Sequence, residues 1–169
     1  MVGSIIEFLK SPKTGPYPLF EAAVAASRNP IFYRDFEVPD TFDGRFDALL
    51  LHLWPIFRAI EKEEKLGQGL YDLTFKRMEL ALRETGVGDL AVGKQVRAMM
   101  QAFYGRLSTY TVCTNESQWR EALRRNLYGT IKREDFSVPD GVVRYAIRLS
   151  QINMPLDDIK AGKFTYPAP

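Results

Sequence analysis

The segment DTFDGRFDALLLHLWPIFRAI, residues 40–60, carries the clearest structural signal in the chain. Its apolar side chains recur at the 3.6-residue spacing of an α-helix. They form one stripe, made of Phe46, Leu49, Leu50, Leu53, Phe57 and Ile60. The opposite side of an ordinary surface helix is polar, yet here it carries Ala48, Leu51 and Pro55. Either the helix is central and buried on two sides, or its second side is an exposed apolar strip that binds a partner.

Proline, glycine and the apolar periodicity divide the rest of the chain into further helices. We expect helices over residues 2–10, 19–28, 40–64, 68–85, 90–112, 115–129 and 142–152, and a short helical turn after Pro155. Residues 31–39 are expected to form an extended connector. No stretch of the chain alternates apolar and polar residues for long enough to build a sheet. The predicted fold is all-α, a single-domain irregular bundle of six to seven helices over residues 1–169. Residues 1–18 would be an N-terminal arm and residues 153–169 a C-terminal tail with a loose end.

The segment 90–112 is expected to be a second central helix. Its core side holds Val96, Met99, Met100, Phe103, Leu107 and Tyr110. The opposite side holds the small residues Ala98, Ala102, Gly105 and Thr109, which would let another helix approach closely.

Two helix entries share a motif, because Asp35-Phe-Glu-Val-Pro-Asp40 returns as Asp135-Phe-Ser-Val-Pro-Asp140. Each proline keeps the residue before it extended, and the aspartate after it can cap the helix that follows. The sequence therefore predicts that Asp40 and Asp140 are N-caps and that Phe36 and Phe136 anchor the two connectors in the core.

Composition excludes most catalytic machinery. Among 169 residues there is one histidine, His52, and one cysteine, Cys113, so neither a disulfide framework nor a histidine–cysteine zinc site can form within the chain. No phosphate-binding glycine loop occurs either. We expect no catalytic residue, no metal and no cofactor. An enzyme that uses Asp43, Asp47 or His52 remains as an alternative.

No apolar run reaches the roughly 20 residues of a membrane-spanning helix, and the N-terminus resembles no targeting signal. A cytoplasmic location is expected, with a peripheral position at the inner face of the cytoplasmic membrane left open. Eight basic residues lie between Ala91 and Arg133, against two acidic ones. We expect Lys94, Arg97, Arg120 and Arg124 to face anionic lipid or ribosomal RNA. The alternative is a solvated helix surface.

Several strings resemble the ubiquinol–cytochrome c chaperone family. They are PIFY at 30–33, VPDTFDGRFD at 38–47, LLLHL at 49–53, LYDLTF at 70–75, GVGDL at 86–90, VGK at 92–94 and AFYGR at 102–106. Together they place the family-like helical core at residues 19–127.

The resemblance implies a non-enzymatic assembly factor for respiratory complex III that holds newly made cytochrome b. Mitochondrial members act at the ribosomal exit with a small partner protein. The present chain is similar to the short bacterial type, so whether that partner applies here is left open. A ribosome- or RNA-binding helical module without a membrane-protein client is the alternative function.

A factor that holds a membrane protein needs exposed apolar surface. Under the exposed-strip interpretation of residues 40–60, Leu51 and Pro55 contact the client and Trp54 anchors the edge of the strip. Asp47 and Arg58 would form its charged rim. Under the central-helix interpretation, Leu51 belongs to the core.

Overall fold

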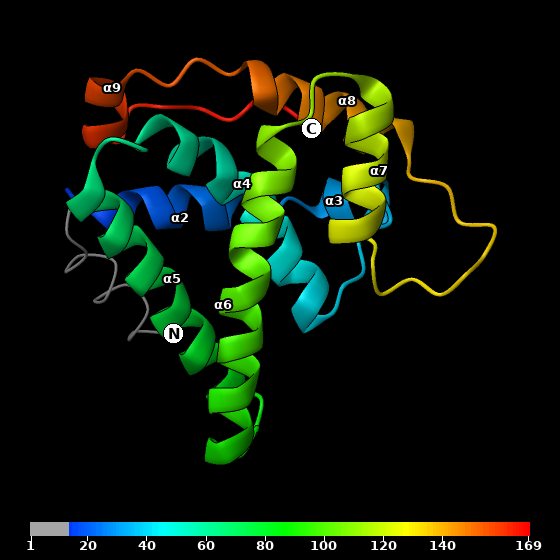
Figure 1. Cartoon of the computed structure of the whole chain (residues 1–169), viewed down its shortest axis with the longest axis horizontal. Helices are drawn as coiled ribbons and strands as arrows, with labels where there is room; N and C mark the ends of the chain where they lie inside the picture. Colours follow the sequence, from blue (N-terminus) through cyan, green and yellow to red (C-terminus); the bar gives the residue numbers. More distant parts are fainter. Residues whose placement is uncertain (1–13) are drawn as a thin grey trace.

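In the computed structural model, which describes residues 14–169, the regular secondary structure of that range is entirely helical (Figure 1). The helices are α2 (Pro16–Ser27), α3 (Pro30–Arg34), α4 (Phe42–Ala59), α5 (Glu64–Glu84), α6 (Asp89–Thr111), α7 (Glu116–Asn126), α8 (Asp140–Gln151) and α9 (Leu156–Lys160). The all-α class is confirmed. The helix expected over residues 2–10 lies outside the described residues.

Helix α4 occupies the centre of the molecule and packs against α2, α6 and α8. Its two apolar sides belong to different core clusters. Leu50 and Leu53 pack with side chains of α2, α5 and α6, whereas Leu51 and Trp54 pack with side chains of α7 and α8. Leu50, Leu51 and Leu53 are all fully buried. The central-helix interpretation of residues 40–60 is therefore confirmed.

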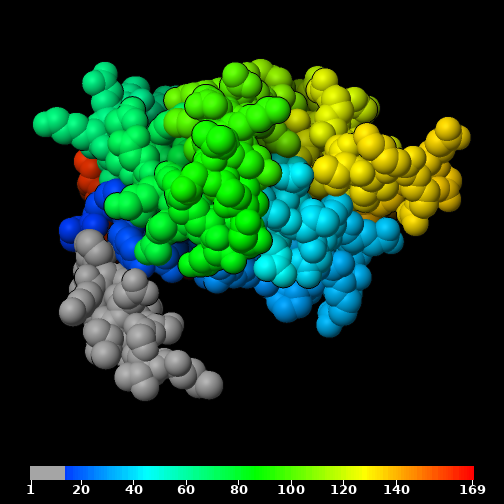
Figure 2. Space-filling view, turned by 90° about the horizontal axis from the view of Figure 1, so that it is seen from below, coloured from blue at the N-terminus to red at the C-terminus, as the bar shows by residue number. Residues whose placement is uncertain are grey.

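Helix α6, by contrast, is not central. Val92, Met99, Phe103 and Tyr110 are buried on its inner side. Its outer side is open, with Ala98 and Gly105 exposed, and Figure 1 shows α6 at the front of the molecule. Figure 2, seen from below, looks onto the green tip formed by the end of α5 and the start of α6. The prediction of a second central helix was wrong because small residues permit close packing but do not require it. No other element among residues 14–169 covers this side.

The helix after Pro39 is capped by a different residue from the one expected. Thr41 is the N-cap of α4, and its Oγ1 accepts a hydrogen bond from the Gly44 backbone N at 3.1 Å. Asp40 lies one residue too early and forms an ion pair with Arg45, with Nε and Oδ1 2.6 Å apart. A Cβ at Gly44 would collide with the Pro39 carbonyl oxygen, so this tight helix entry requires glycine there.

The second helix entry also departs from the prediction. Asp140 is the first residue of α8, not its cap, and its carboxylate lies 2.8 Å from Nη2 of Arg120. The capping prediction was therefore wrong for both aspartates. The anchoring prediction is confirmed, because Phe36 and Phe136 are both buried.

Residues 31–39 are not extended throughout, as expected from the sequence, because they begin within the short helix α3. Asn29 caps this helix, accepting a hydrogen bond from Ile31 N at 3.1 Å, and Pro30 occupies its first position. Asparagine at the cap followed by proline is a helix-start signal that outweighed the strand propensity of Ile31 and its neighbours.

The C-terminal segment packs onto the helices instead of ending loosely. The Tyr166 hydroxyl donates a hydrogen bond to the His52 carbonyl oxygen at 2.7 Å, beside the middle of α4. Phe164 and Tyr166 meet edge to face, with ring centroids 5.6 Å apart. The segment therefore contributes to the core that surrounds α4.

Candidate functional site

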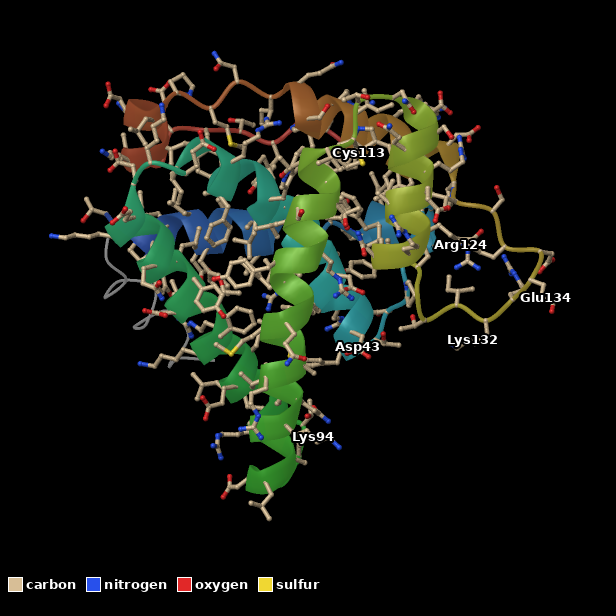
Figure 3. The ribbon with its side chains drawn as sticks, in the orientation of Figure 1. Asp43, Lys94, Cys113, Arg124, Lys132 and Glu134 are labelled. Atoms are coloured by element: carbon tan, nitrogen blue, oxygen red, sulfur yellow. The ribbon has the colours of Figure 1, made fainter. Side chains whose placement is uncertain are left out.

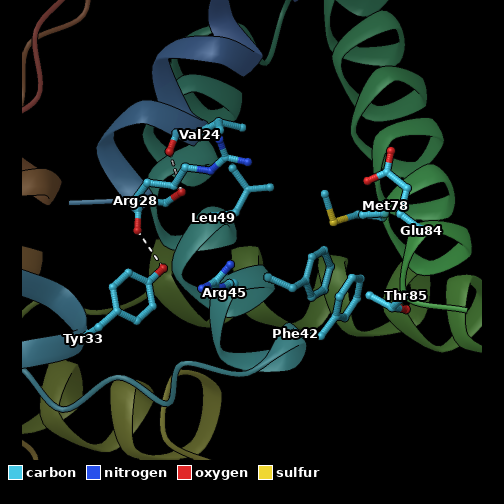
Figure 4. Close-up of a pocket in the computed structure, with 12 residues that line it drawn as sticks. Val24, Arg28, Tyr33, Phe42, Arg45, Leu49, Met78, Glu84 and Thr85 are labelled. Atoms are coloured by element: carbon cyan, nitrogen blue, oxygen red, sulfur yellow. Dashed lines mark hydrogen bonds between the residues drawn. The ribbon is translucent and has the colours of Figure 1, made fainter. Parts of the chain in front are cut away.

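An open groove of about 540 Å³ lies between the C-terminal ends of α2 and α5 and the N-terminal half of α4 (Figure 4). Its lining residues are Val24, Ser27, Arg28, Tyr33, Phe42, Arg45, Phe46, Leu49, Met78, Ala81, Glu84 and Thr85. This volume falls within the range of about 300–1,000 Å³ that is typical of ligand sites.

The floor of the groove is apolar. Phe46 and Leu49 are buried there, and they belong to the first apolar stripe of α4. Val24, Phe42 and Met78 are half-buried around them and remain accessible from outside. An occupant that covered these side chains would gain about 25 cal/mol for each Å² of apolar surface removed from water.

The walls of the groove carry charge. Arg28 projects from the end of α2, and Glu84 stands on α5 on the opposite side (Figure 4). Arg45 also lines the groove, but Asp40 neutralises it, and the hydrogen bond from Arg45 lowers the pKa of Asp40. Among residues 14–169, neither Arg28 nor Glu84 forms an ion pair.

Tyr33 stabilises the α2 wall. Its hydroxyl donates a hydrogen bond to the Ser27 carbonyl oxygen at 2.8 Å, which satisfies one of the carbonyl groups left free at the helix end. Burial raises the pKa of Tyr33, so its hydroxyl keeps its proton and remains a donor at neutral pH. The wall that carries Arg28 is therefore held in place by α3.

The lining of the groove is mostly apolar and holds few side chains that could transfer a proton. Its lining contains no histidine or cysteine and one carboxylate, Glu84. Within the described residues, no group of three or more His, Cys, Asp or Glu side chains could hold a metal ion. Apolar side chains flanked by an isolated cation and an isolated anion can hold an amphipathic segment of another chain.

The apolar strip proposed from the sequence is not a surface. Leu51 is fully buried, Trp54 is 2% exposed, and Pro55 is buried as well. The Trp54 ring packs edge to face against Tyr110 and Trp119, and its Nε1 donates a hydrogen bond to Thr111 Oγ1 at 3.0 Å. Because α6 and α7 cover this side of α4, the exposed-strip interpretation was wrong.

The two charged residues expected at the rim have internal roles. Asp47 is buried, and its Oδ1 lies 2.8 Å from Arg106 Nε. The Arg58 guanidinium lies 4.8 Å from the centre of the Trp54 ring and donates a hydrogen bond to the Ser150 carbonyl oxygen at 2.9 Å. Arg58 thus joins the end of α4 to the end of α8.

His52 is also part of the core, with no exposed surface. Its Nδ1 lies 2.7 Å from the Ala48 carbonyl oxygen, which can only accept, so Nδ1 carries the proton. Nε2 then accepts a hydrogen bond from the Tyr145 hydroxyl at 2.8 Å. These partners give His52 a structural role and leave the alternative of an enzyme based on it without support.

The four basic residues predicted to face lipid or RNA divide into two pairs. Lys94 and Arg97 are exposed on α6. Arg120 forms ion pairs with Glu116 and Asp140, whereas Arg124 donates a hydrogen bond to the Tyr128 carbonyl oxygen at 3.2 Å.

The two pairs also lie in different places. Figure 3 shows Lys94 near the free end of α6, far from Arg124 and Lys132. The four residues therefore do not form one basic patch. A contact of Lys94 and Arg97 with lipid or ribosome remains a prediction.

Sequence reasoning missed the groove, although one signal for it was present. Phe42 extends the apolar stripe of α4 by one turn beyond Phe46, to the first residue of the helix. Val24 and Met78 come from helices about 20 and 35 residues away in the chain, and only the packed fold brings them beside Phe42.

Comparison with known proteins supports one family. Residues 34–166 match the family model for the ubiquinol-cytochrome C chaperone. The chain is 30% identical over 149 residues to the mitochondrial protein CBP3 of Saccharomyces cerevisiae, a match that covers 82% of this chain and 44% of the yeast protein. The chain thus spans less than half the length of that relative.

A solved structure gives the same result. The crystal structure of the Cbp3 homolog from Brucella abortus is similar with a TM-score of 0.73 and 28% sequence identity, over 89% of this chain and 87% of that one. The family match extends from the end of α3 into the C-terminal segment that packs beside α4. The chain therefore belongs to the ubiquinol–cytochrome c chaperone family.

Proposed function

We propose that this chain is a non-enzymatic assembly factor for respiratory complex III that binds newly made cytochrome b. Membership of the chaperone family and the similarity to CBP3 and its Brucella homolog support the assembly role. The observation that carries the binding role is the groove of about 540 Å³, in which Val24, Phe42 and Met78 offer accessible apolar surface around a buried floor. We assign the client site to this groove in place of the buried strip around Leu51.

Such a role requires the chaperone to cover the apolar surface of its client reversibly. A membrane-protein segment outside the bilayer exposes apolar side chains to water, and the groove offers Val24, Phe42 and Met78 to pack against them. Because the groove is open to solvent, it covers such a segment only in part and the client can leave again. No helix within residues 14–169 has the length and apolar character needed to cross a membrane.

The alternative of an RNA-binding module has weaker support. Within the described residues, Arg120, Arg125 and Arg133 of the basic stretch are engaged by carboxylates. RNA affinity that falls steeply as salt rises, without cytochrome b capture, would favour this alternative.

The test is co-purification of cytochrome b with the tagged full chain from its native host, after RNase treatment. Ala81→Glu places a carboxylate and extra bulk on the half-buried groove wall and should reduce capture severalfold. Leu90→Glu is the matched control, because Leu90 is 96% exposed and lies outside the groove.

Circular dichroism would verify that both variants keep the helical content of the wild type. Absence of cytochrome b from the wild-type sample would contradict the proposed function. Equal capture by Ala81→Glu and Leu90→Glu would contradict the assignment to the groove.

A further inference from the structure

We infer that the segment held in the groove is a short amphipathic helix with an acidic side chain toward Arg28 and a basic side chain toward Glu84, and not a fully apolar membrane span. The inference rests on the proposed function of the groove and specifies the chemistry of its occupant. It follows from the size of the groove and from the two charges on its walls.

The size of the groove limits the length of the occupant. A membrane-spanning helix needs about 20 apolar residues and is about 30 Å long. A groove of about 540 Å³ has the size of a small-ligand site and holds only a few side chains. Helices that dock in grooves of this kind do so through anchors at positions i, i+3 or i+4, and i+7. The occupant is therefore about two helical turns long where it contacts the groove.

Arg28 leaves positive charge on the α2 wall. It is exposed at the C-terminal end of α2, and no carboxylate among residues 14–169 pairs with it. The neighbouring cation, Arg45, is already neutralised by Asp40. An acidic side chain of the occupant would find Arg28 free to pair.

Glu84 leaves negative charge on the α5 wall, at a position that is locally unfavourable. It is the last residue of α5, and the partial negative charge at the C-terminal end of a helix disfavours a carboxylate there. The adjacent Arg83 does not compensate it, because Arg83 pairs with Glu79 and Asp89. A basic side chain of the occupant would relieve both the isolated charge and its conflict with the dipole.

The two charges orient the occupant because they stand on opposite walls of one apolar floor (Figure 4). A helix with an apolar ridge, an acidic side chain on one edge and a basic side chain on the other can match the apolar floor, Arg28 and Glu84 at once. It can do so in only one orientation along the groove. A fully apolar helix would displace water from Arg28 and Glu84 without forming an ion pair with either. This uncompensated desolvation costs free energy.

The experiment measures binding of model peptides to the purified full chain by fluorescence anisotropy. The probe is a labelled 15-residue helical peptide with Leu and Phe on one face, a Glu on one edge and a Lys on the other. Arg28→Glu should weaken its binding about fivefold, since an exposed ion pair is worth up to about 1 kcal/mol and the reversal also adds repulsion. The same peptide with its Glu changed to Lys should recover affinity for Arg28→Glu.

Glu84→Lys provides the reciprocal test with a peptide whose Lys is changed to Glu. Lys132→Glu is the matched control, because this exposed lysine lies on the loop after α7, away from the groove (Figure 3). It should leave the affinity for every peptide within twofold of the wild type. Raising the salt concentration should reduce the differences among the variants.

Three results of the peptide experiment would overturn the inference. They are equal effects of Arg28→Glu and Lys132→Glu, absence of rescue by the reversed peptides, and equal binding of a fully apolar peptide. Dimerisation abolished by Arg28→Glu would assign the groove to a second copy of the chain and also overturn it.

Failure of the inference can be told from failure of the proposed function. Cytochrome b capture without charge-dependent peptide binding overturns the inference alone. Charge-dependent peptide binding without cytochrome b capture supports the inference and overturns the identity of the client.

Discussion

At the residue scale, burial affects the pKa of Asp47 more strongly than its ion pair with Arg106 does. Its Oδ1 lies 2.8 Å from Arg106 Nε, yet burial raises its pKa to about 7, and Arg106 only partly offsets this effect. Neither of these two atoms makes a well-aligned hydrogen bond in the described part of the molecule, nor does the buried hydroxyl of the neighbouring Tyr110. The protonated form of Asp47 is therefore favoured by folding.

This raised pKa predicts a pH dependence of stability. The folded chain binds the proton of Asp47 more tightly than the unfolded chain does, so the stabilisation is complete below pH 4 and is lost as pH rises through about 7. Asp47→Asn removes the titration. The free energy of unfolding of the wild type, relative to this variant, should fall by about 3 kcal/mol between pH 5 and pH 8. Urea denaturation at several pH values measures it, and parallel curves for the two proteins would contradict the prediction.

His52 titrates in the opposite sense. Burial lowers its pKa to about 4, because a charged imidazole cannot be hydrated in the core. Its stabilising effect is present above about pH 6.5, the pKa of the unfolded state, and is lost as pH falls toward 4. Since His52 is the one histidine of the chain, its ring-proton resonance can be assigned directly by NMR. The resonance should stay constant from pH 7 to pH 5.5, and a midpoint near 6.5 would show that the ring is accessible to water.

At the level of the elements, the starts of α4 and α7 each depend on one polar side chain at the N-cap position, and a shift by one residue removes its hydrogen bond. Thr41 and Asn115 cap α4 and α7 by accepting hydrogen bonds from Gly44 N and Gln118 N. For α4, the candidates Asp40 and Thr41 are adjacent, and the backbone geometry decides between them.

Capping predicts a contrast between these neighbours. Thr41→Ala should lower the free energy of unfolding by about 1 kcal/mol, because the Gly44 N–H loses its partner. Asp40→Ala removes an exposed ion pair with Arg45 that solvent screens, so it should lower the free energy of unfolding by less than Thr41→Ala does. Chemical denaturation of both variants tests the contrast. An equal or larger loss for Asp40→Ala would restore Asp40 as the cap.

At the level of the whole molecule, α4 is stabilised by helices on both of its apolar sides. Leu51 faces α7 and α8, whereas Leu50 and Leu53 face α2, α5 and α6. A polar group placed on either side would therefore lie in the core.

Leu51→Glu should consequently unfold the protein or lower its melting temperature by more than 10 °C, because it buries an unpaired carboxylate. Leu90→Glu introduces the same side chain at a position that is 96% exposed and should shift the melting temperature by less than about 2 °C. Thermal unfolding followed by circular dichroism compares them. A stable Leu51→Glu protein would show that the side of α4 facing α7 and α8 can open.

The sequence by itself determined most of the helices of residues 14–169 and the anchoring roles of Phe36 and Phe136, but it missed α3. For residues 40–60 it left two interpretations open, a helix buried on two sides and an exposed apolar strip. These features depend on periodicity and on side chains close together in the chain. The choice between a buried and an exposed Leu51 depended on α7 and α8, which begin more than 60 residues later. The exposed outer side of α6 and the groove between Arg28 and Glu84 likewise needed the tertiary structure. A helical pattern states which side chains share a face, but only the packing of distant elements decides which faces are covered.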